Sequence, residues 1–220
     1  MKPTTKTRVK ICCISSIEEA KTAIHFGASA LGLVSEMPSG PGVISYEEIY
    51  KIAKEIPPPI ATFLLTSKID TSEIIAQQKR LGTNTLQLVD KLKTGTHTQI
   101  RDALPGIKIV QVIHVIDDNS VQQAVEVSKN VDALLLDSGN PNLKIKELGG
   151  TGRVHNWELS RQIREKVNVP VFLAGGLNHT NVREAIGTVS PFSVDICSGV
   201  RTNGKLDESK LKLFFSEVYK

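Results

Sequence analysis

The sequence has no apolar run that approaches the ~18 residues of a membrane-spanning helix. Its basic N-terminus, residues 1–8, leads into no apolar segment of the kind found in secretion signals. No membrane partner is therefore expected, and the expected location is the cytoplasm. The chain also has no block of basic residues and no alternation of basic and aromatic residues, and its net charge is only +4. These features argue against a nucleic-acid partner.

Cysteine is scarce, with only Cys12, Cys13 and Cys197 in the chain. No cysteine or histidine pair has the spacing of a zinc site, so no metal is expected. Two of the three cysteines are adjacent, and adjacent cysteines rarely bond to each other. The sequence therefore predicts reduced cysteines in an intracellular compartment.

The 220 residues are 40% hydrophobic and 23% charged, which is ordinary for a chain that buries a substantial core. Short apolar runs recur along the chain, and each is followed by a segment with a helical pattern. The expected strands are 7–12, 30–35, 60–65, 85–89, 107–115, 133–136, 170–174 and 193–197. The expected helices are 16–26, 45–55, 70–81, 96–104, 117–129, 156–166, 178–187 and 207–218.

Strands that alternate with helices indicate parallel pairing with right-handed crossovers. Eight such units predict an α/β protein with a closed (β/α)8 TIM barrel, and an open doubly wound sheet is the alternative. No linker or low-complexity segment interrupts the chain. We therefore expect a single domain over 1–220, with residues 1–6 as a flexible tail.

The active site of such a barrel lies at the carboxyl ends of its strands. The seventh and eighth expected strands end in Gly175-Gly176 and in Ser198-Gly199. Glycines at these ends let backbone N–H groups approach an anion, and a nearby helix N-terminus favours negative charge. The sequence thus predicts a phosphorylated small-molecule ligand. The alternative is that these glycines only permit tight turns.

Two groups at the same face could transfer protons. Cys12 ends the first expected strand, and Asp137 ends the sixth. A thiol of lowered pKa can act as a base or a nucleophile, although a buried cysteine is more often a small hydrophobic residue. Asp137 could instead cap its own loop. Because the two strands are well separated around the ring, an acid and a base that act on different atoms would suit them.

Two further features concern the barrel interior and its mouth. Lys10 lies within the first expected strand, where a charged side chain is costly unless it is paired, and Asp195 of the eighth strand is a candidate partner. The sixth expected strand is followed by a long segment that contains Gly149, Gly150 and Gly152. That segment could fold over a substrate and exclude water, or it could be a simple flexible connection.

Several motifs keep their order and spacing from the first strand to the last helix. They are Lys10-Ile11-Cys12, Leu135-Leu136-Asp137, Gly149-Gly150-Thr151-Gly152 with Trp157, Leu173-Ala174-Gly175-Gly176-Leu177 with Asn181-Val182, and Val194-Asp195 and Ser198-Gly199-Val200 with Gly204-Lys205 and Asp207. Together they resemble the phosphoribosylanthranilate isomerase family over nearly the whole chain.

The resemblance implies an aldose–ketose isomerase that needs no cofactor. Such an enzyme converts N-(5-phosphoribosyl)anthranilate into 1-(2-carboxyphenylamino)-1-deoxyribulose 5-phosphate by an Amadori rearrangement in tryptophan biosynthesis. It implies that Cys12 is the general base at sugar C2 and that Asp137 is the general acid at the ring oxygen. We expect a monomer or a homodimer. The residues expected to bind the substrate and its phosphate are Gly150, Gly152, Gly175, Gly176, Ser198 and Gly199.

The chain departs from the family pattern where the anthranilate end should bind. Cys13 stands in place of a glycine, and Gly42 stands where the family has a substrate-binding arginine. Val89 and Asp90 replace a histidine and a glycine. Two alternatives therefore stay open. One is an enzyme that acts on another phosphorylated sugar, and the other is a non-catalytic barrel that binds a phosphorylated metabolite.

Overall fold

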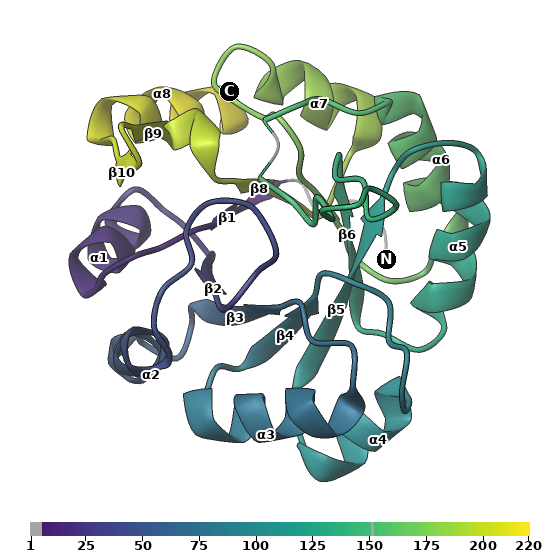
Figure 1. Cartoon of the computed structure of the whole chain (residues 1–220). Helices are drawn as coiled ribbons and strands as arrows, with labels where there is room; N and C mark the ends of the chain where they lie inside the picture. The colour runs from purple at the N-terminus through teal and green to yellow at the C-terminus, as the bar shows by residue number, and fades with distance from the viewer. Residues whose placement is uncertain (1–5, 151) are drawn as a thin grey trace.

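A computed structural model of the protein describes residues 6–150 and 152–220. Eight parallel strands close into a barrel in sequence order, with β1 paired to both β2 and β8 (Figure 1). This closure confirms the predicted barrel and excludes the open sheet. The strands are β1 (Arg8–Ile11), β2 (Ala30–Val34), β3 (Ala61–Thr66), β4 (Thr85–Leu88), β5 (Lys108–His114), β6 (Ala133–Asp137), β7 (Val171–Leu173) and β8 (Ser193–Ile196).

A helix follows each strand, and the helices surround the strands (Figure 1). The helices are α1 (Ile17–His25), α2 (Tyr46–Glu55), α3 (Thr71–Leu81), α4 (His97–Ala103), α5 (Asn119–Ser128), α6 (Trp157–Lys166), α7 (Val182–Val189) and α8 (Glu208–Val218). After β8 the chain also forms a short 3-10 helix, η1 (Ser198–Val200), and a small hairpin of β9 (Arg201–Thr202) and β10 (Lys205–Leu206).

Local sequence explains where the helices begin. The side chains of Ser16 and Ser45 accept hydrogen bonds from backbone N–H groups in the first turns of α1 and α2, and Thr96 forms a capping box with Gln99. Such caps satisfy backbone donors that the helix itself leaves free. The helix starts are thus encoded within a few residues, which is why the sequence predicts them.

The alternation of side chains along the strands produces two apolar layers. Val9 and Ile11 of β1 point outward and join the large cluster between the strands and the helices. Lys10 points into the barrel, where its Nζ lies 5.2 Å from the centre of the Phe63 ring. A smaller interior cluster, which includes Phe63 and Phe172, fills the barrel beneath the carboxyl ends of the strands.

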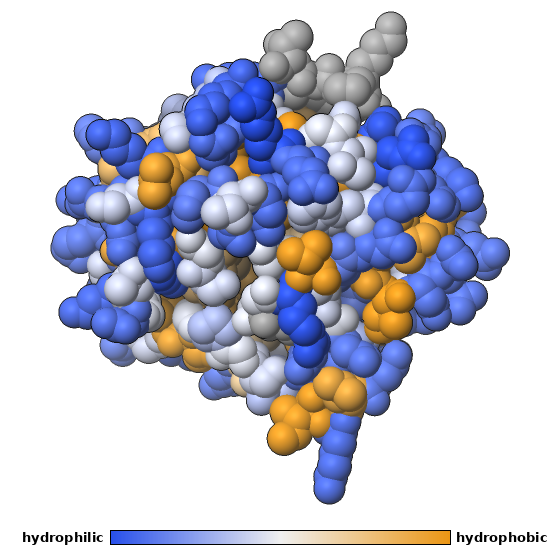
Figure 2. Space-filling model, turned by 90° about the horizontal axis from the view of Figure 1, so that it is seen from above, coloured by the Kyte–Doolittle hydropathy of each residue, from blue (hydrophilic) through white to orange (hydrophobic). Residues whose placement is uncertain are grey.

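One side of the molecule is shown in Figure 2, where hydrophilic residues predominate and apolar residues form small separate groups. Across the described residues, no helix combines the length and the apolar character needed to cross a membrane. Of the expected tail, residues 1–5 lie outside the described residues. Lys6 is described, and its Nζ lies 4.1 Å from the centre of the Tyr219 ring.

Candidate active site

A cavity opens at the carboxyl ends of the strands, where the topology predicted the site. Its walls include Cys12, Asp137, Gly150, Gly152, Gly175, Gly176 and Ser198. Of the predicted site residues only Gly199 does not line it. A Cβ on Gly199 would lie 2.2 Å from the carbonyl oxygen of Leu177, so this glycine packs against the loop after β7. Thr151 lies outside the described residues.

Cys12 follows β1 directly and is buried at the cavity wall, 6% exposed. Cys12 is the cysteine with a free thiol. Burial raises the pKa of this thiol to about 11, although the ammonium group of Lys10 acts in the opposite direction. Sγ of Cys12 and Nζ of Lys10 both pack against Gly32, where a Cβ would lie 2.7 Å and 3.0 Å from them respectively. Gly32 therefore leaves room for the thiol and the ammonium group to meet.

Lys10 is completely buried and forms the predicted ion pair, with Nζ 2.9 Å from Oδ1 of Asp195. The two residues are partners in the β1–β8 register. Burial alone would lower the pKa of Lys10, but the Asp195 carboxylate and the Cys12 thiol outweigh that effect, so the pKa is raised. The shift favours the charged ammonium form of Lys10 next to Cys12.

Asp137 ends β6 on another side of the cavity and is also buried. Burial raises the pKa of its carboxyl group, while the backbone N–H of Ser138, 2.8 Å from Oδ1, opposes that rise. A Cβ on Gly149 would lie 3.0 Å from Oδ2 of Asp137, so the backbone of the following loop covers the carboxyl group. The shift favours the protonated form, which a general acid requires.

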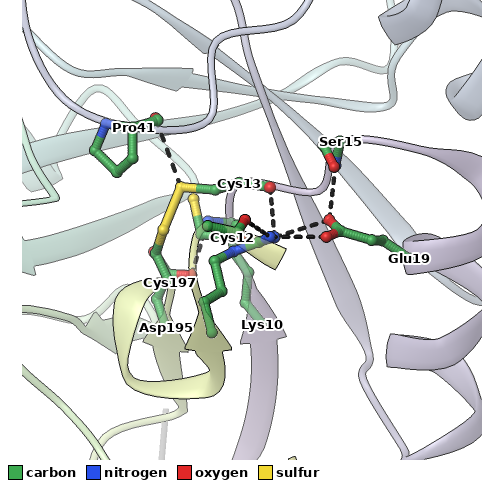
Figure 3. Close-up of a disulfide and its surroundings, with 10 residues drawn as sticks. Lys10, Cys12, Cys13, Ser15, Glu19, Pro41, Asp195 and Cys197 are labelled. Carbon is green, nitrogen blue, oxygen red and sulfur yellow. Dashed lines mark hydrogen bonds and ion pairs between the residues drawn. A yellow bond between two sulfur atoms is a disulfide. The ribbon is translucent and has the colours of Figure 1, made fainter. Parts of the chain in front are cut away.

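Cys13 and Cys197 form a disulfide, with their Cα atoms 5.8 Å apart (Figure 3). The expectation of reduced cysteines is therefore wrong for these two residues. The partners are 184 residues apart in sequence. They meet only because β1 pairs with β8, so no local pattern could have revealed the bond. Both cysteines line the cavity.

Arg201 is a residue of the site region that sequence reasoning missed. It follows η1, and its guanidinium donates to the carbonyl oxygen of Cys13 at 2.5 Å and to both carboxylate oxygens of Glu19 at 2.8 Å and 2.9 Å. Glu19 also accepts from the backbone N–H of Ser15 at 3.0 Å. This network fixes the segment after β1 to the segment after β8.

The loops after β6, β7 and β8 approach one another backbone to backbone. Gly175 and Gly176 have φ values of +83° and +63°, which glycine adopts without steric cost. A Cβ on Gly176 would lie 2.6 Å from the carbonyl carbon of Arg153. Among the described residues, the N–H groups of Gly175 and Gly176 find no acceptor. The glycines therefore leave backbone donors beside the cavity.

Two loops cover the mouth of the cavity. The hydroxyl of Ser39, in the loop after β2, donates to the carbonyl oxygen of Lys146, in the loop after β6, at 2.7 Å. A Cβ on Gly150 would lie 2.5 Å from Cδ of Pro41, so the same two loops are in close contact further along. The enclosed space is about 80 Å³.

The positions that depart from the family pattern divide into two groups. Cys13 and Val89 line the cavity, whereas Gly42 and Asp90 do not. Asp90 instead forms an ion pair with Lys146. Within the part of the chain that the structure describes, no lysine or arginine lines the cavity, and no cluster of side chains has the composition of a metal site.

A closed barrel with a thiol, a carboxyl group and glycine loops around one cavity at its carboxyl face is the architecture of a (β/α)8-barrel enzyme. The family model described as "N-(5'phosphoribosyl)anthranilate (PRA) isomerase" matches residues 9–217. The chain therefore belongs to the N-(5'-phosphoribosyl)anthranilate isomerase family.

Individual relatives agree with this assignment. The chain is 36% identical over 206 residues to N-(5'-phosphoribosyl)anthranilate isomerase 2 of Methanosarcina mazei, covering 93% of this chain and 90% of the relative. The crystal structure of the isomerase from Thermotoga maritima superposes with a TM-score of 0.80 at 29% identity, covering 97% of this chain and 98% of that one.

A further solved isomerase contains reduced 1-(o-carboxyphenylamino)-1-deoxyribulose 5-phosphate. It matches this chain with a TM-score of 0.77 and 27% identity, covering 97% of this chain and 98% of that one. That protein thus binds a phosphorylated ligand.

Proposed function

We propose that the protein is a phosphoribosylanthranilate isomerase of tryptophan biosynthesis in which Cys12 is the general base and Asp137 the general acid. The observation that carries the proposal is how the cavity wall is divided. Glycines of the loops after β6 and β7, together with Ser198 after β8, form one part of the wall, and apolar side chains at the carboxyl ends of β2, β3 and β4 form another. Cys12 and Asp137 lie where the two parts meet.

This division fits a substrate with a phosphate at one end and an aromatic ring at the other. The N–H groups of Gly175 and Gly176, which find no acceptor among the described residues, would bind the phosphate together with the Ser198 hydroxyl. Met37, Leu65 and Val89 would pack against the anthranilate ring. The sugar would then span the centre of the cavity, between the thiol and the carboxyl group.

The reaction needs one proton donated and one removed. Asp137 gives its proton to the furanose ring oxygen. As the bond between that oxygen and C1 breaks, the lone pair of the anthranilate nitrogen forms a C=N bond to C1, so the ring opens to an iminium whose C2 proton is acidic. The Cys12 thiolate then takes the proton from C2, and the resulting enol rearranges to the ketone when C1 gains a proton and the C2 hydroxyl loses one. Burial raises the pKa of the Cys12 thiol, and the Lys10 ammonium group, held by Asp195, works against that rise and so assists formation of the thiolate that the second step requires.

The loops after β2 and β6 narrow the mouth through which the substrate would enter. Ligand sites of this type usually enclose about 300–1,000 Å³, whereas the space here is about 80 Å³. The contacts between the loops after β2 and β6 must therefore open for binding and reform afterwards. Reclosure would exclude water from the opened sugar.

The test is the turnover of freshly generated phosphoribosylanthranilate, followed through the loss of its fluorescence. We expect turnover by the wild type and its loss in Cys12→Ser and in Asp137→Asn. Asp102→Asn is the matched control, because Asp102 is an exposed carboxylate on α4. Absence of turnover above spontaneous decay, from wild-type protein with the circular dichroism of a folded barrel, would refute the proposal.

As a biosynthetic enzyme the protein would work in the cytoplasm, and its expected state remains a monomer or a homodimer.

A further inference from the structure

The Cys13–Cys197 disulfide joins the two parts of the active site that the proposed reaction uses. Cys13 directly follows the proposed base Cys12, and Cys197 directly precedes Ser198 in the proposed phosphate loop (Figure 3). Both sulfur-bearing side chains form part of the cavity wall. The bond therefore fixes the distance between the backbone at the base and the backbone at the phosphate loop.

The backbone of Cys13 explains why such a bond matters here. Its φ is +61°, a left-handed conformation that residues with a Cβ rarely adopt. Glycine, the residue of the family pattern at this position, adopts it freely. Without an attachment, a cysteine at position 13 would tend toward a negative φ. Such a change would turn the Cys13 carbonyl group away from Arg201, which binds it at 2.5 Å.

We propose that the Cys13–Cys197 disulfide is a positioning element for Cys12, so that the oxidised protein is the active form and reduction of this bond lowers turnover. The inference rests on the proposed function. In the oxidised form the bond and Arg201 together hold the segment after β1 in the geometry that glycine would otherwise provide. In the reduced form Arg201 and the backbone hydrogen bonds of Cys12 and Ile14 remain, but nothing covalent opposes the change of φ at Cys13, and the base shifts relative to the bound sugar.

The reductant is a dithiol. One of its thiolates attacks a sulfur of the Cys13–Cys197 bond and forms a mixed disulfide, and its second thiolate then displaces the remaining protein sulfur. The protein gains two electrons and two protons as two thiols, and the reductant becomes a disulfide. Because the bond lines the cavity, a small dithiol can reach it when the loops after β2 and β6 separate, as they must for the substrate.

The first measurement counts thiols and turnover in the same samples. Before reduction the denatured protein should titrate one thiol, that of Cys12, and after dithiothreitol it should titrate three. We expect kcat for phosphoribosylanthranilate to fall by about tenfold to a hundredfold on reduction, since a displacement of ~1 Å in a catalytic group can cost that much. Reoxidation should restore kcat.

Variants show whether the Cys13–Cys197 bond positions Cys12 for catalysis or only stabilises the fold. Cys13→Gly and Cys13→Ala both lack the bond, but only glycine accepts the left-handed conformation without strain. We expect Cys13→Gly to have a higher kcat than Cys13→Ala, and neither variant to respond to dithiothreitol. Cys197→Ala should behave as the reduced wild type in kcat. A purely structural bond would instead change unfolding midpoints and leave kcat at 25 °C the same in all of these proteins.

The experiment separates failure of the positioning role from failure of the proposed function. If neither redox form of the wild type turns over the substrate, the proposed function fails. If the wild type is active and its kcat is the same in both redox forms, or if the protein as isolated titrates three thiols and is fully active, the positioning role is wrong. Equal kcat values for Cys13→Gly and Cys13→Ala would also overturn it.

Discussion

A Cβ atom on Gly42 would lie 2.4 Å from Cβ of Cys13. Real Cβ atoms do not approach so closely, so a side chain at residue 42 would force residue 13 or its backbone to shift. Two departures from the family pattern, the cysteine at 13 and the glycine at 42, are therefore one coupled exchange. The arginine that the family places after its second strand has no room beside Cys13.

This coupling predicts a stability difference between two backgrounds that both lack the disulfide. Gly42→Ala should cost about 1–3 kcal/mol more free energy of unfolding in Cys13→Ala than in Cys13→Gly, because only the former retains the clashing Cβ. Backbone strain at residue 42, whose φ is +83°, is common to both backgrounds and cancels. Urea unfolding of the four proteins measures the difference. If Gly42→Ala lowered the free energy of unfolding equally in both backgrounds, the Cβ contact would be relieved by small shifts at no energetic cost, and the prediction would be wrong.

For the buried pair of Lys10 and Asp195, we expect the single variant Lys10→Met to be much less stable than the double variant that also carries Asp195→Asn. Lys10→Met leaves the Asp195 carboxyl group buried without its partner, which typically costs about 3–5 kcal/mol. Asp195→Asn in the same background removes the unpaired charge and should recover a substantial part of that loss. Urea denaturation at neutral pH would detect both effects. A loss below about 1 kcal/mol in Lys10→Met would contradict the assignment of this pair as a structural ion pair.

The fold could be predicted from sequence because its information is local. The caps at Ser16, Ser45 and Thr96 and the alternation of short apolar runs with helical segments fix all eight units. The Lys10–Asp195 pair was also predictable, because a lysine within a barrel strand needs a partner. The topology alone placed Cys12 and Asp137 at one mouth.

Other contacts of the site could not be predicted from the sequence, because they depend on the strand register and on the paths of the loops. Cys13 meets Cys197, and Arg201 meets Glu19, only through the closure between β1 and β8. The ion pair of Lys146 with Asp90 depends on the path of the loop after β6, which carries no periodic pattern. The high pKa of the Cys12 thiol follows from its burial at the cavity wall, which spacing along the chain cannot reveal.

That pKa predicts how fast Cys12 reacts with iodoacetamide. Only the thiolate reacts, and with a pKa of about 11 its fraction rises about tenfold for each pH unit below that value. The alkylation rate should therefore rise without a plateau from about pH 7 to about pH 9.5, whereas an ordinary cysteine, with a pKa of about 8.5, begins to level off there. Mass spectrometry of the unreduced protein follows the reaction at this one free thiol. Glutathione treated in parallel provides the comparison, and a Cys12 profile that levels off with it would contradict the raised pKa.

The last prediction concerns Gln87, which lies on β4 and lines the cavity. Its Oε1 is buried and has no hydrogen-bond partner among the described residues. An unpartnered buried acceptor costs the folded protein about 1–3 kcal/mol, so its presence at a ligand cavity indicates a donor on the substrate. Gln87→Met should therefore lower kcat/KM by about tenfold or more while leaving the free energy of unfolding unchanged or higher.

Gln78 offers the matched control, because its side chain is buried too but is fully engaged. Its Nε2 donates to the carbonyl oxygen of Thr83, and its Oε1 accepts from the Thr83 hydroxyl at 2.8 Å. Gln78→Met should lower the free energy of unfolding by about 1–3 kcal/mol and leave kcat/KM unchanged, since it breaks hydrogen bonds that the substrate never meets. Steady-state kinetics and urea unfolding of both variants give the comparison. If Gln87→Met destabilised the fold as Gln78→Met does and left kcat/KM intact, the buried oxygen of Gln87 would be a structural acceptor and not a contact for the substrate.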